Sequence, residues 1–255
     1  MQVDFGKTAA DYGRHRAGFP DGFFEHLFQR SLIAPGSRVL DVGTGTGTVA
    51  RGLAKRGCNV LGLDPSATLL QEAERLDGEA GVAVDYVRAS AEETGQPSHN
   101  FDVVTAGQCW HWFDRPRAAI EARRVIVPGG HLVIGRFDWL PLPGNVVEAT
   151  ERLILSHNPD WRGAGGSGVY PAWFTDLAVA VFVDVESFSF DIDVPYSHEA
   201  WLGRIRASAG VGASLAADTV AKFGAQHSDL LIRKFPEQPL RIPHRVFVVF
   251  GRSLA

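Results

Sequence analysis

The sequence predicts a doubly wound α/β fold with a mostly parallel sheet. In the first half of the chain, apolar runs of strand length alternate with helical patterns, which is typical of successive βαβ units. A glycine-rich loop at residues 43–47 directly follows the first of these runs. The chain has 255 residues, so it can bury a hydrophobic core without disulfides or metal ions.

The first half supplies five expected strands and the helices between them. The strands are expected at Arg38–Asp41, Asn59–Asp64, Val84–Ala89, Phe101–Thr105 and His131–Gly135. Helices are expected at Val49–Arg56, from Pro65 and Ser66 to Leu76, and at Pro116–Val125. A turn at Pro128-Gly129-Gly130 is expected to precede the fifth strand.

The second half is expected to add two strands and three helices. The helices are expected at Asn145–His157, His198–Ala209 with Ser197 as N-cap, and Ala216–Phe235. The strands are expected at Val179–Phe190 and Arg245–Arg252, and a glycine-rich loop at residues 161–168. Residues Asp191–Pro239 are interpreted as a helical insert between the last two strands, which would form an antiparallel hairpin at one sheet edge.

Composition and charge exclude several classes of protein. The 25 basic and 29 acidic residues give a net charge of −4, whereas sequence-independent nucleic-acid binding needs clustered Lys and Arg. No window reaches the roughly 18 uncharged apolar residues of a membrane span. Cys58 and Cys109 match neither a disulfide framework nor a metal-ligand spacing. We therefore expect no nucleic-acid partner, no membrane, no metal and a cytoplasmic location.

The strongest functional signal lies at Val39–Thr48, where the sequence VLDVGTGTGT takes a buried strand through a glycine loop into a helix. Glycines let the backbone approach a ligand closely, and a helix start offers free N–H groups to an anion. Asp64 ends the next strand, where a carboxylate typically binds ribose hydroxyls. The pattern predicts an adenosine-containing cofactor. It leaves NAD open, because Gly45-x-Gly47-x-x-Ala50 fits the loose dinucleotide pattern.

Further segments resemble the class I S-adenosylmethionine-dependent methyltransferases. The loop looks like that family's E/D-x-G-x-G-x-G motif with Asp41 in the acidic position, and Ser90-Ala91-Glu92 resembles its acidic-polar segment. Phe101–Asp114, FDVVTAGQCWHWFD, looks like a stretch of the small-molecule subgroup that includes the trans-aconitate methyltransferase-like proteins. Phe5, Ala9, Tyr12, Arg16, Phe19 and Pro20 resemble that subgroup's entry segment, from which Ala17 and Phe19 depart. The resemblance covers residues 5–136.

The resemblance implies a Rossmann-like methyltransferase fold with strand order 3-2-1-4-5-7-6 and a reversed seventh strand. It implies one methyltransferase domain over residues 1–255, with a helical N-terminal lid at 1–35 and a cofactor-binding core at 36–140. The insert at 191–239 would be a helical substrate cap. A monomer and a homodimer both stay open.

The resemblance also implies S-adenosylmethionine as cofactor and a small molecule as substrate. The glycine loop would face the methionine part, Asp64 the ribose, and Ala91 and Glu92 the adenine. Gln108 would contact the amino-acid end, and Tyr12 and Arg16 would close over the site. The cofactor-binding residues expected on this basis are Tyr12, Arg16, Asp41, Gly43, Thr44, Gly45, Gly47, Asp64, Pro65, Ser90, Ala91, Glu92 and Gln108.

Methyl transfer by direct SN2 displacement needs alignment of the reactants and exclusion of water. Trp110 and Trp112 are candidates for substrate contact, because aromatic faces attract positive charge; the alternative is that they fill the core. His111 is a candidate general base, or a residue that orders its loop. An NAD(P)-dependent oxidoreductase and a catalytically silent binding protein remain alternatives. The sequence leaves the acceptor atom, O, N, C or S, open.

Overall fold

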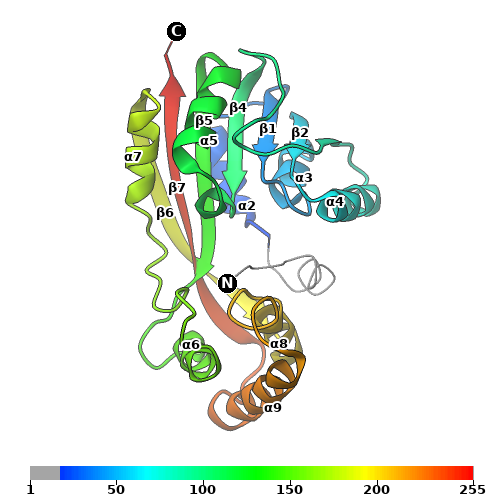
Figure 1. The fold of residues 1–255 in the computed structure, drawn as a ribbon, viewed down its shortest axis with the longest axis vertical. Helices are drawn as coiled ribbons and strands as arrows, with labels where there is room; N and C mark the ends of the chain where they lie inside the picture. Colours follow the sequence, from blue (N-terminus) through cyan, green and yellow to red (C-terminus); the bar gives the residue numbers. More distant parts are fainter. Residues whose placement is uncertain (1–17, 255) are drawn as a thin grey trace. The chain divides into compact units, whose positions relative to one another are not determined.

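The computed structural model describes residues 18–254, which form an α/β fold around a seven-stranded sheet (Figure 1). The strand order is β3-β2-β1-β4-β5-β7-β6, as predicted. The β2–β3, β1–β2, β1–β4 and β4–β5 pairs are parallel, and β7 runs against β5 and β6 in Figure 1. The strands are β1 (Arg38–Val42), β2 (Asn59–Leu63), β3 (Asp85–Val87), β4 (Phe101–Gly107), β5 (Ile126–Trp139), β6 (Phe182–Tyr196) and β7 (Leu240–Ser253).

Helices precede or connect these strands along the chain. They are α2 (Asp21–Gln29), α3 (Thr48–Ala54), α4 (Ala67–Ala80), the 3₁₀ turn η2 (Trp110–Trp112), α5 (Arg115–Val125), α6 (Val146–His157), α7 (Ala172–Val179), α8 (His198–Arg206) and α9 (Ala217–Lys234). One buried cluster joins α5 and α7 to β1, β4, β5 and β7. Within residues 18–254, none of these helices has the length and apolar character needed to cross a bilayer.

Contacts along the chain define two compact units, which we describe separately. The sheet unit comprises Gly18–Phe137, Tyr170–Phe190 and residues 246–254. The helical unit comprises Asp138–Val169 and Asp191–Arg245, and contains α6, α8 and α9. Strands β5, β6 and β7 run along the chain from one unit into the other. One methyltransferase domain with a lid and a cap stays a prediction.

The helical unit has its own core around a buried polar contact. Trp201 of α8 is fully buried, and its Nε1 donates a hydrogen bond of 3.2 Å to Oγ1 of Thr150 on α6. The same hydroxyl lies 3.1 Å from Nε2 of His227 on α9, so one threonine links all three helices. Ile154 and Leu231 are among the apolar side chains that surround it.

Helix starts follow the capping chemistry of short polar residues, whose side chains accept orphan backbone N–H groups. Ser197 caps α8 as predicted, accepting from the amide of Ala200 at 3.1 Å. Ser66 caps α4, Asp114 caps α5 and Asn145 caps α6 in the same way.

The turn predicted at Pro128-Gly129-Gly130 is wrong, because β5 runs through these residues from Ile126. The register between β4 and β5 shifts between Phe101 and Val103, which marks a bulge. A Cβ on Gly130 would lie 2.4 Å from the carbonyl oxygen of Asp102, so the strands approach closely here only because residue 130 is glycine. Pro and Gly therefore mark an irregularity within a strand, not its end.

Elements of the second half also differ from the prediction, and β7 begins at Leu240 instead of Arg245. Residues 172–179 form α7, to which no helix was assigned, and β6 begins at Phe182 instead of Val179. A helix of eight residues is shorter than the window over which helical periodicity can be recognised. Residues 191–196 continue β6, so the helices of the expected insert begin at His198.

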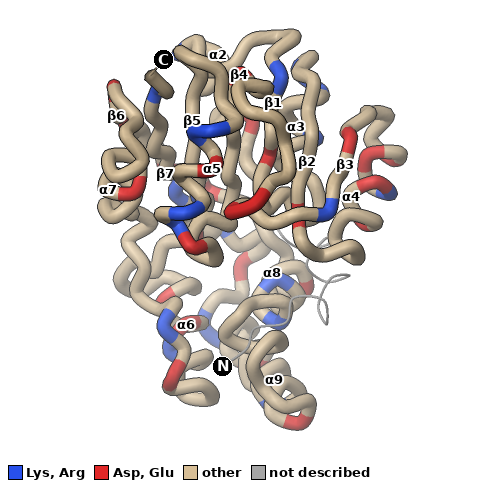
Figure 2. The backbone as a smooth tube through the Cα atoms, turned by 45° about the horizontal axis from the view of Figure 1, so that its top comes forward, with Lys and Arg blue, Asp and Glu red and all other residues tan. Residues whose placement is uncertain are grey.

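Acidic and basic residues are interspersed over the described chain (Figure 2). On α5, Arg117 pairs with Glu93 at 2.7 Å and Arg124 pairs with Glu121 at 2.7 Å. These arginines form ion pairs at a solvated helix face, in agreement with the interleaved charges of the sequence.

Candidate functional site

The glycine loop, Asp64 and Gln108 lie at the same edge of the sheet. Strand β1 pairs in parallel with β2 on one side and with β4 on the other. Because the carboxyl ends of parallel strands meet at one edge, the segments that follow these three strands converge there. Asp64 follows β2 and Gln108 follows β4, on either side of the loop that follows β1.

Asp41 stabilises the start of the loop from within the sheet. It is 1% exposed, and its two carboxylate oxygens accept hydrogen bonds from the hydroxyls of Thr44 at 2.6 Å and Thr105 at 2.7 Å. Burial raises the pKa of Asp41 to about 6, although both hydroxyls lower it. Asp41 therefore links the loop to β4 and positions Thr44.

The three loop glycines all have positive φ but differ in their surroundings. A Cβ on Gly43 would lie 2.8 Å from atoms of Cys109 and Phe113, and one on Gly47 would lie 2.4 Å from Oη of Tyr86. A Cβ on Gly45, where φ is +58°, would meet no atom of residues 18–254 within 4 Å. Described residues thus occupy the space beside Gly43 and Gly47, and of the three loop glycines only Gly45 has no described residue beside it.

Asp64 is fixed against the loop by backbone donors. Its Oδ2 accepts from the amide of Gly45 at 3.0 Å and its Oδ1 from the amide of Ser66 at 2.9 Å. Burial raises the pKa of Asp64, while these two bonds lower it. Each carboxylate oxygen has two lone pairs, so one on each oxygen is left by these bonds for a further donor. Pro65 follows, and its carbonyl accepts from Nε of Arg88 at 3.0 Å.

The segment after β3 is tied to the start of α5. Ala91 is buried, and Ser90 forms an isolated bridge with Glu93. Oε1 of Glu92 accepts from the amide of Asp114 at 2.9 Å, directly before α5. The contact fixes Glu92 in the sheet unit, next to the segment that follows β4.

Gln108 adopts a strained backbone and leaves one buried acceptor. Its φ is +69°, which is unusual for a residue other than glycine, and its amide donates to the carbonyl of Gly135 at 2.9 Å. Its side-chain Nε2 donates to the carbonyl of Phe137. Its Oε1 is buried without a hydrogen-bond partner, within the part of the chain that the structure describes. A buried acceptor of this kind suits an N–H or O–H donor from a ligand.

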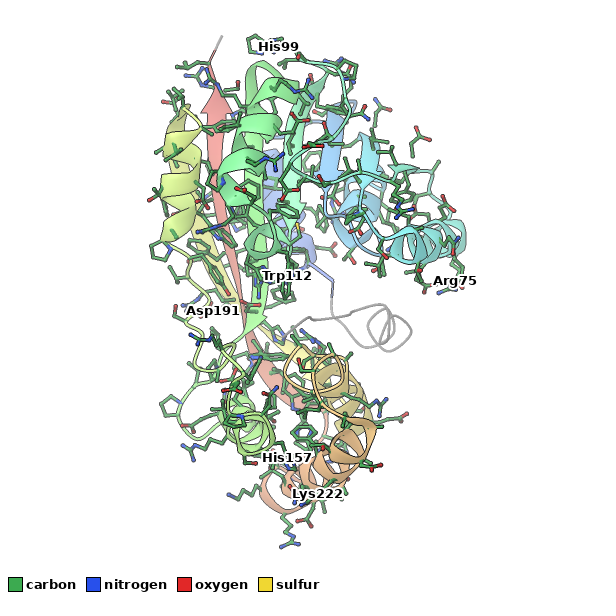
Figure 3. All side chains as sticks on the ribbon, viewed as in Figure 1. Arg75, His99, Trp112, His157, Asp191 and Lys222 are labelled. Carbon is green, nitrogen blue, oxygen red and sulfur yellow. The ribbon has the colours of Figure 1, made fainter. Side chains whose placement is uncertain are left out.

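Trp110 and Trp112, the two expected substrate contacts, lie in different environments. Trp110 is 1% exposed, and its Nε1 donates to Oδ2 of Asp176 on α7 at 2.9 Å. Trp112 is 52% exposed and lies at the end of the sheet unit where the parallel strands finish (Figure 3). The structure therefore places Trp110 in the core and leaves Trp112 on the surface beside the site.

His111 lies against a guanidinium group that the sequence analysis missed. Nη1 of Arg136 lies 2.5 Å from Nδ1 of the His111 ring and 3.1 Å from Nε2. Because a guanidinium only donates hydrogen bonds, the ring nitrogen it meets acts as an acceptor. The guanidinium also lies 5.5 Å from the ring centre of Tyr170. Arg136 is near the end of β5, and no motif in the sequence singles it out.

Tyr12 and Arg16, the two residues expected to close over the site, lie outside the described residues. Across residues 18–254, no group of three or more His, Cys, Asp or Glu side chains is arranged to hold a metal ion.

Comparison with known proteins gives a family for the part of the chain that carries this site. Residues 40–134 match the family model described as "Methyltransferase domain". An uncharacterised methyltransferase of Mycobacterium tuberculosis is 36% identical over 153 residues, which cover 58% of this chain and 60% of that protein. The chain thus spans less than two thirds of the curated relative's length. These findings show that residues 40–134 are similar to the methyltransferase domain.

Solved structures share the fold over more of the chain. A structure named as a type II methyltransferase from Anaeromyxobacter dehalogenans has a TM-score of 0.65 and 26% identity, covering 94% of this chain and 98% of that one. A phosphoethanolamine N-methyltransferase of Haemonchus contortus, solved with S-adenosylhomocysteine, has a TM-score of 0.56 and 19% identity. It covers 98% of this chain and 57% of that one, and at this identity it supports the fold alone.

Proposed function

We propose that this chain is an S-adenosylmethionine-dependent methyltransferase that methylates a small molecule by direct SN2 transfer. The observation that carries the proposal is the space beside Gly45, which no residue from 18 to 254 fills, next to an Asp64 carboxylate whose oxygens keep free lone pairs. A positive φ at Gly45 and a fixed carboxylate on the neighbouring strand suit an adenosine group bound across the strand ends.

The chain's residues fit the two ends of this cofactor. Asp64 is positioned to accept hydrogen bonds from ribose hydroxyls, and the unpartnered Oε1 of Gln108 suits the ammonium group of the methionine part. Ala91 and Glu92 are assigned to the adenine by their place after β3. Gly43 and Gly47 have a packing role in this proposal. Without a Cβ, Gly43 can pack against Cys109 and Phe113, and Gly47 can pack against Tyr86.

The bound cofactor supplies a methyl group already activated on a sulfonium. The protein's contribution is to hold the acceptor in line and to exclude water, without a covalent step of its own. Trp112 offers an exposed aromatic face to a cationic or planar acceptor. For His111 to take a proton from an acceptor hydroxyl, its ring must first exchange the N–H of Arg136 for that hydroxyl.

The resemblance of FDVVTAGQCWHWFD to the trans-aconitate methyltransferase-like subgroup supports a small acceptor. Nucleic acid is not proposed as a substrate, because the acidic and basic residues are interspersed and Arg117 and Arg124 of α5 pair with acids.

Isothermal titration of the full chain with S-adenosylhomocysteine, NAD and NADP tests the proposal. Only S-adenosylhomocysteine should bind, and Asp64→Ala should weaken its binding by at least about tenfold, since the ribose hydroxyls lose a charged acceptor. Binding of NAD or NADP in place of S-adenosylhomocysteine would favour an oxidoreductase. Binding of the cofactor without turnover of any acceptor in a panel of O-, N-, C- and S-nucleophiles would favour a silent binding protein.

A further inference from the structure

A buried polar cluster lies behind the glycine loop, and none of the ligand contacts above uses it. It consists of Arg51 on α3, Asp77 on α4 and Tyr86 on β3, which we call the loop brace. Nε of Arg51 lies 2.6 Å from Oδ1 of Asp77, and Oη of Tyr86 donates to Oδ2 of Asp77 at 2.8 Å. The carboxylate is buried, so each of its oxygens is bound by a side chain from a different element.

Arg51 connects this cluster to the backbone of the loop. Its Nη2 donates to the carbonyl of Thr46 at 2.7 Å and reaches the carbonyl of Ala73 on α4 at 3.3 Å. The amide of Gly47 belongs to the same peptide unit as the Thr46 carbonyl, and it donates to the carbonyl of Thr44 at 2.9 Å. The peptide unit is therefore held at both ends, which fixes the loop one residue after Gly45.

Tyr86 supports the loop by its shape as well as by its hydroxyl. A Cβ on Gly62 of β2 would lie 2.5 Å from Cε1 of Tyr86, and one on Gly47 would lie 2.4 Å from its Oη. The ring thus occupies space that two glycines leave free, one in the sheet and one in the loop. Burial and the hydrogen bond to Asp77 raise the pKa of Tyr86, so the phenol stays a neutral donor to the carboxylate.

Overall stability does not explain why an ion pair is buried here. The free-energy cost of removing two charges from water commonly offsets the attraction between them. Well-packed apolar side chains of similar size often give equal or greater stability. What apolar side chains cannot supply is a directed hydrogen bond to the Thr46 carbonyl.

We propose that Arg51, Asp77 and Tyr86 are positioning residues that hold the glycine loop in the geometry that receives the cofactor. This inference rests on the proposed function. The three side chains act through the Thr46–Gly47 peptide, behind the loop, and their loss changes cofactor affinity without removing a ligand contact.

Three single variants test the loop brace, with titration by S-adenosylhomocysteine and urea unfolding as the two measurements. Asp77→Asn, Tyr86→Phe and Arg51→Lys should each raise the Kd about 3- to 30-fold, the range seen when residues act on a ligand through others. Arg51→Lys is the most informative, because lysine keeps the charge opposite Asp77 but cannot bind the carboxylate and the Thr46 carbonyl together. It should unfold close to the parent and still bind more weakly.

Glu79→Gln is the matched control. It makes the same carboxylate-to-amide change on the same helix, at an exposed side chain that pairs with Arg75 on the outer face of α4 (Figure 3). Its Kd should equal that of the parent. A parent that does not bind S-adenosylhomocysteine overturns the proposed function. The loop-brace proposal alone is overturned if the parent binds S-adenosylhomocysteine and if folded Arg51→Lys and Tyr86→Phe bind it with the same Kd as the parent.

Discussion

Asp41 and Asp64, near the ends of β1 and β2, differ in whether their carboxylate oxygens keep lone pairs available for a further donor. Asp41 is fully buried, and two threonine hydroxyls occupy the positions around its carboxylate. Asp64 is bound by backbone amides, which fix its orientation and keep acceptor positions available. The same side chain therefore stabilises the loop in one place and suits a ligand in the other. The difference comes from tertiary neighbours, since both residues simply follow or end a strand in the sequence.

Alanine substitutions at Gly45 and Gly47 should distinguish a glycine needed for ligand binding from one needed for packing within the protein. Both Gly45→Ala and Gly47→Ala place a methyl group on a residue with positive φ, which costs about 1–2 kcal/mol. Gly47→Ala adds an overlap with Tyr86 and should lower the free energy of unfolding further, by about 1–3 kcal/mol. Gly45→Ala adds no overlap with the described residues, but its methyl enters the proposed cofactor space and should weaken S-adenosylhomocysteine binding by about tenfold or more.

Urea unfolding and isothermal titration measure these two effects. Equal unfolding of the two variants would contradict the packing role of Gly47. Parental affinity in Gly45→Ala would show that the ligand does not use the space beside the loop.

At the scale of elements, α7 anchors the segment that follows β4. Oδ2 of Asp176 accepts from Nε1 of Trp110 at 2.9 Å and lies 3.2 Å from Nη1 of Arg115. The helix thus connects the start of α5 to the tryptophan that precedes His111. The contact therefore fixes Trp110, the residue directly before His111 and Trp112 in the chain.

Asp176→Ala should destabilise the sheet unit by about 1–3 kcal/mol, because it leaves the buried Trp110 N–H without an acceptor. Asp184→Ala, which removes an exposed aspartate paired with Arg252, should change the free energy of unfolding by less than about 1 kcal/mol. Urea unfolding of both variants beside the parent measures the difference. If the free energy of unfolding falls by similar amounts in Asp176→Ala and Asp184→Ala, the Asp176 contact contributes no more to stability than an ion pair at the surface.

Local patterns in the sequence were sufficient for the strands and the loop of the sheet unit. Alternating apolar runs placed β1, β2 and β4, and the loop glycines marked the turn into α3. The irregularity at Gly130 was not predictable, because Pro128 and Gly129 suggest a turn unless the carbonyl of Asp102 is known to lie beside Gly130.

The contacts that shape the site join residues far apart in the sequence. The sequence does not show that Oη of Tyr86 fills the space where a Cβ of Gly47 would lie. Arg51 and Asp77, or His111 and Arg136, are paired by the packing of elements, and no local spacing indicates the pairing. The sequence thus predicts where the site lies, and the tertiary structure shows which of its residues already have partners within the chain.

Across the whole molecule, the two units contain buried groups with opposite responses to pH. Burial raises the pKa of Asp41 in the sheet unit to about 6, and burial lowers the pKa of His227 in the helical unit to about 4. Because the folded form binds the Asp41 proton more tightly than the unfolded form, protonated Asp41 stabilises the fold. This stabilisation is lost as pH rises from about 4 to 6. For His227 the unfolded form binds the proton more tightly, so stability is lost as pH falls below about 6.5.

Two variants that no longer titrate should reveal these contributions separately. The stability of the parent relative to Asp41→Asn should fall by up to about 3 kcal/mol from pH 4 to pH 7. The stability of the parent relative to His227→Gln should fall by a similar amount, about 3 kcal/mol, in the other direction, from pH 7 to pH 4. Urea unfolding of the three proteins over this range gives both differences, and comparison with the parent cancels the titration of all other groups. A difference that stays constant with pH would show that the substituted residue has the same pKa in the folded and unfolded chain.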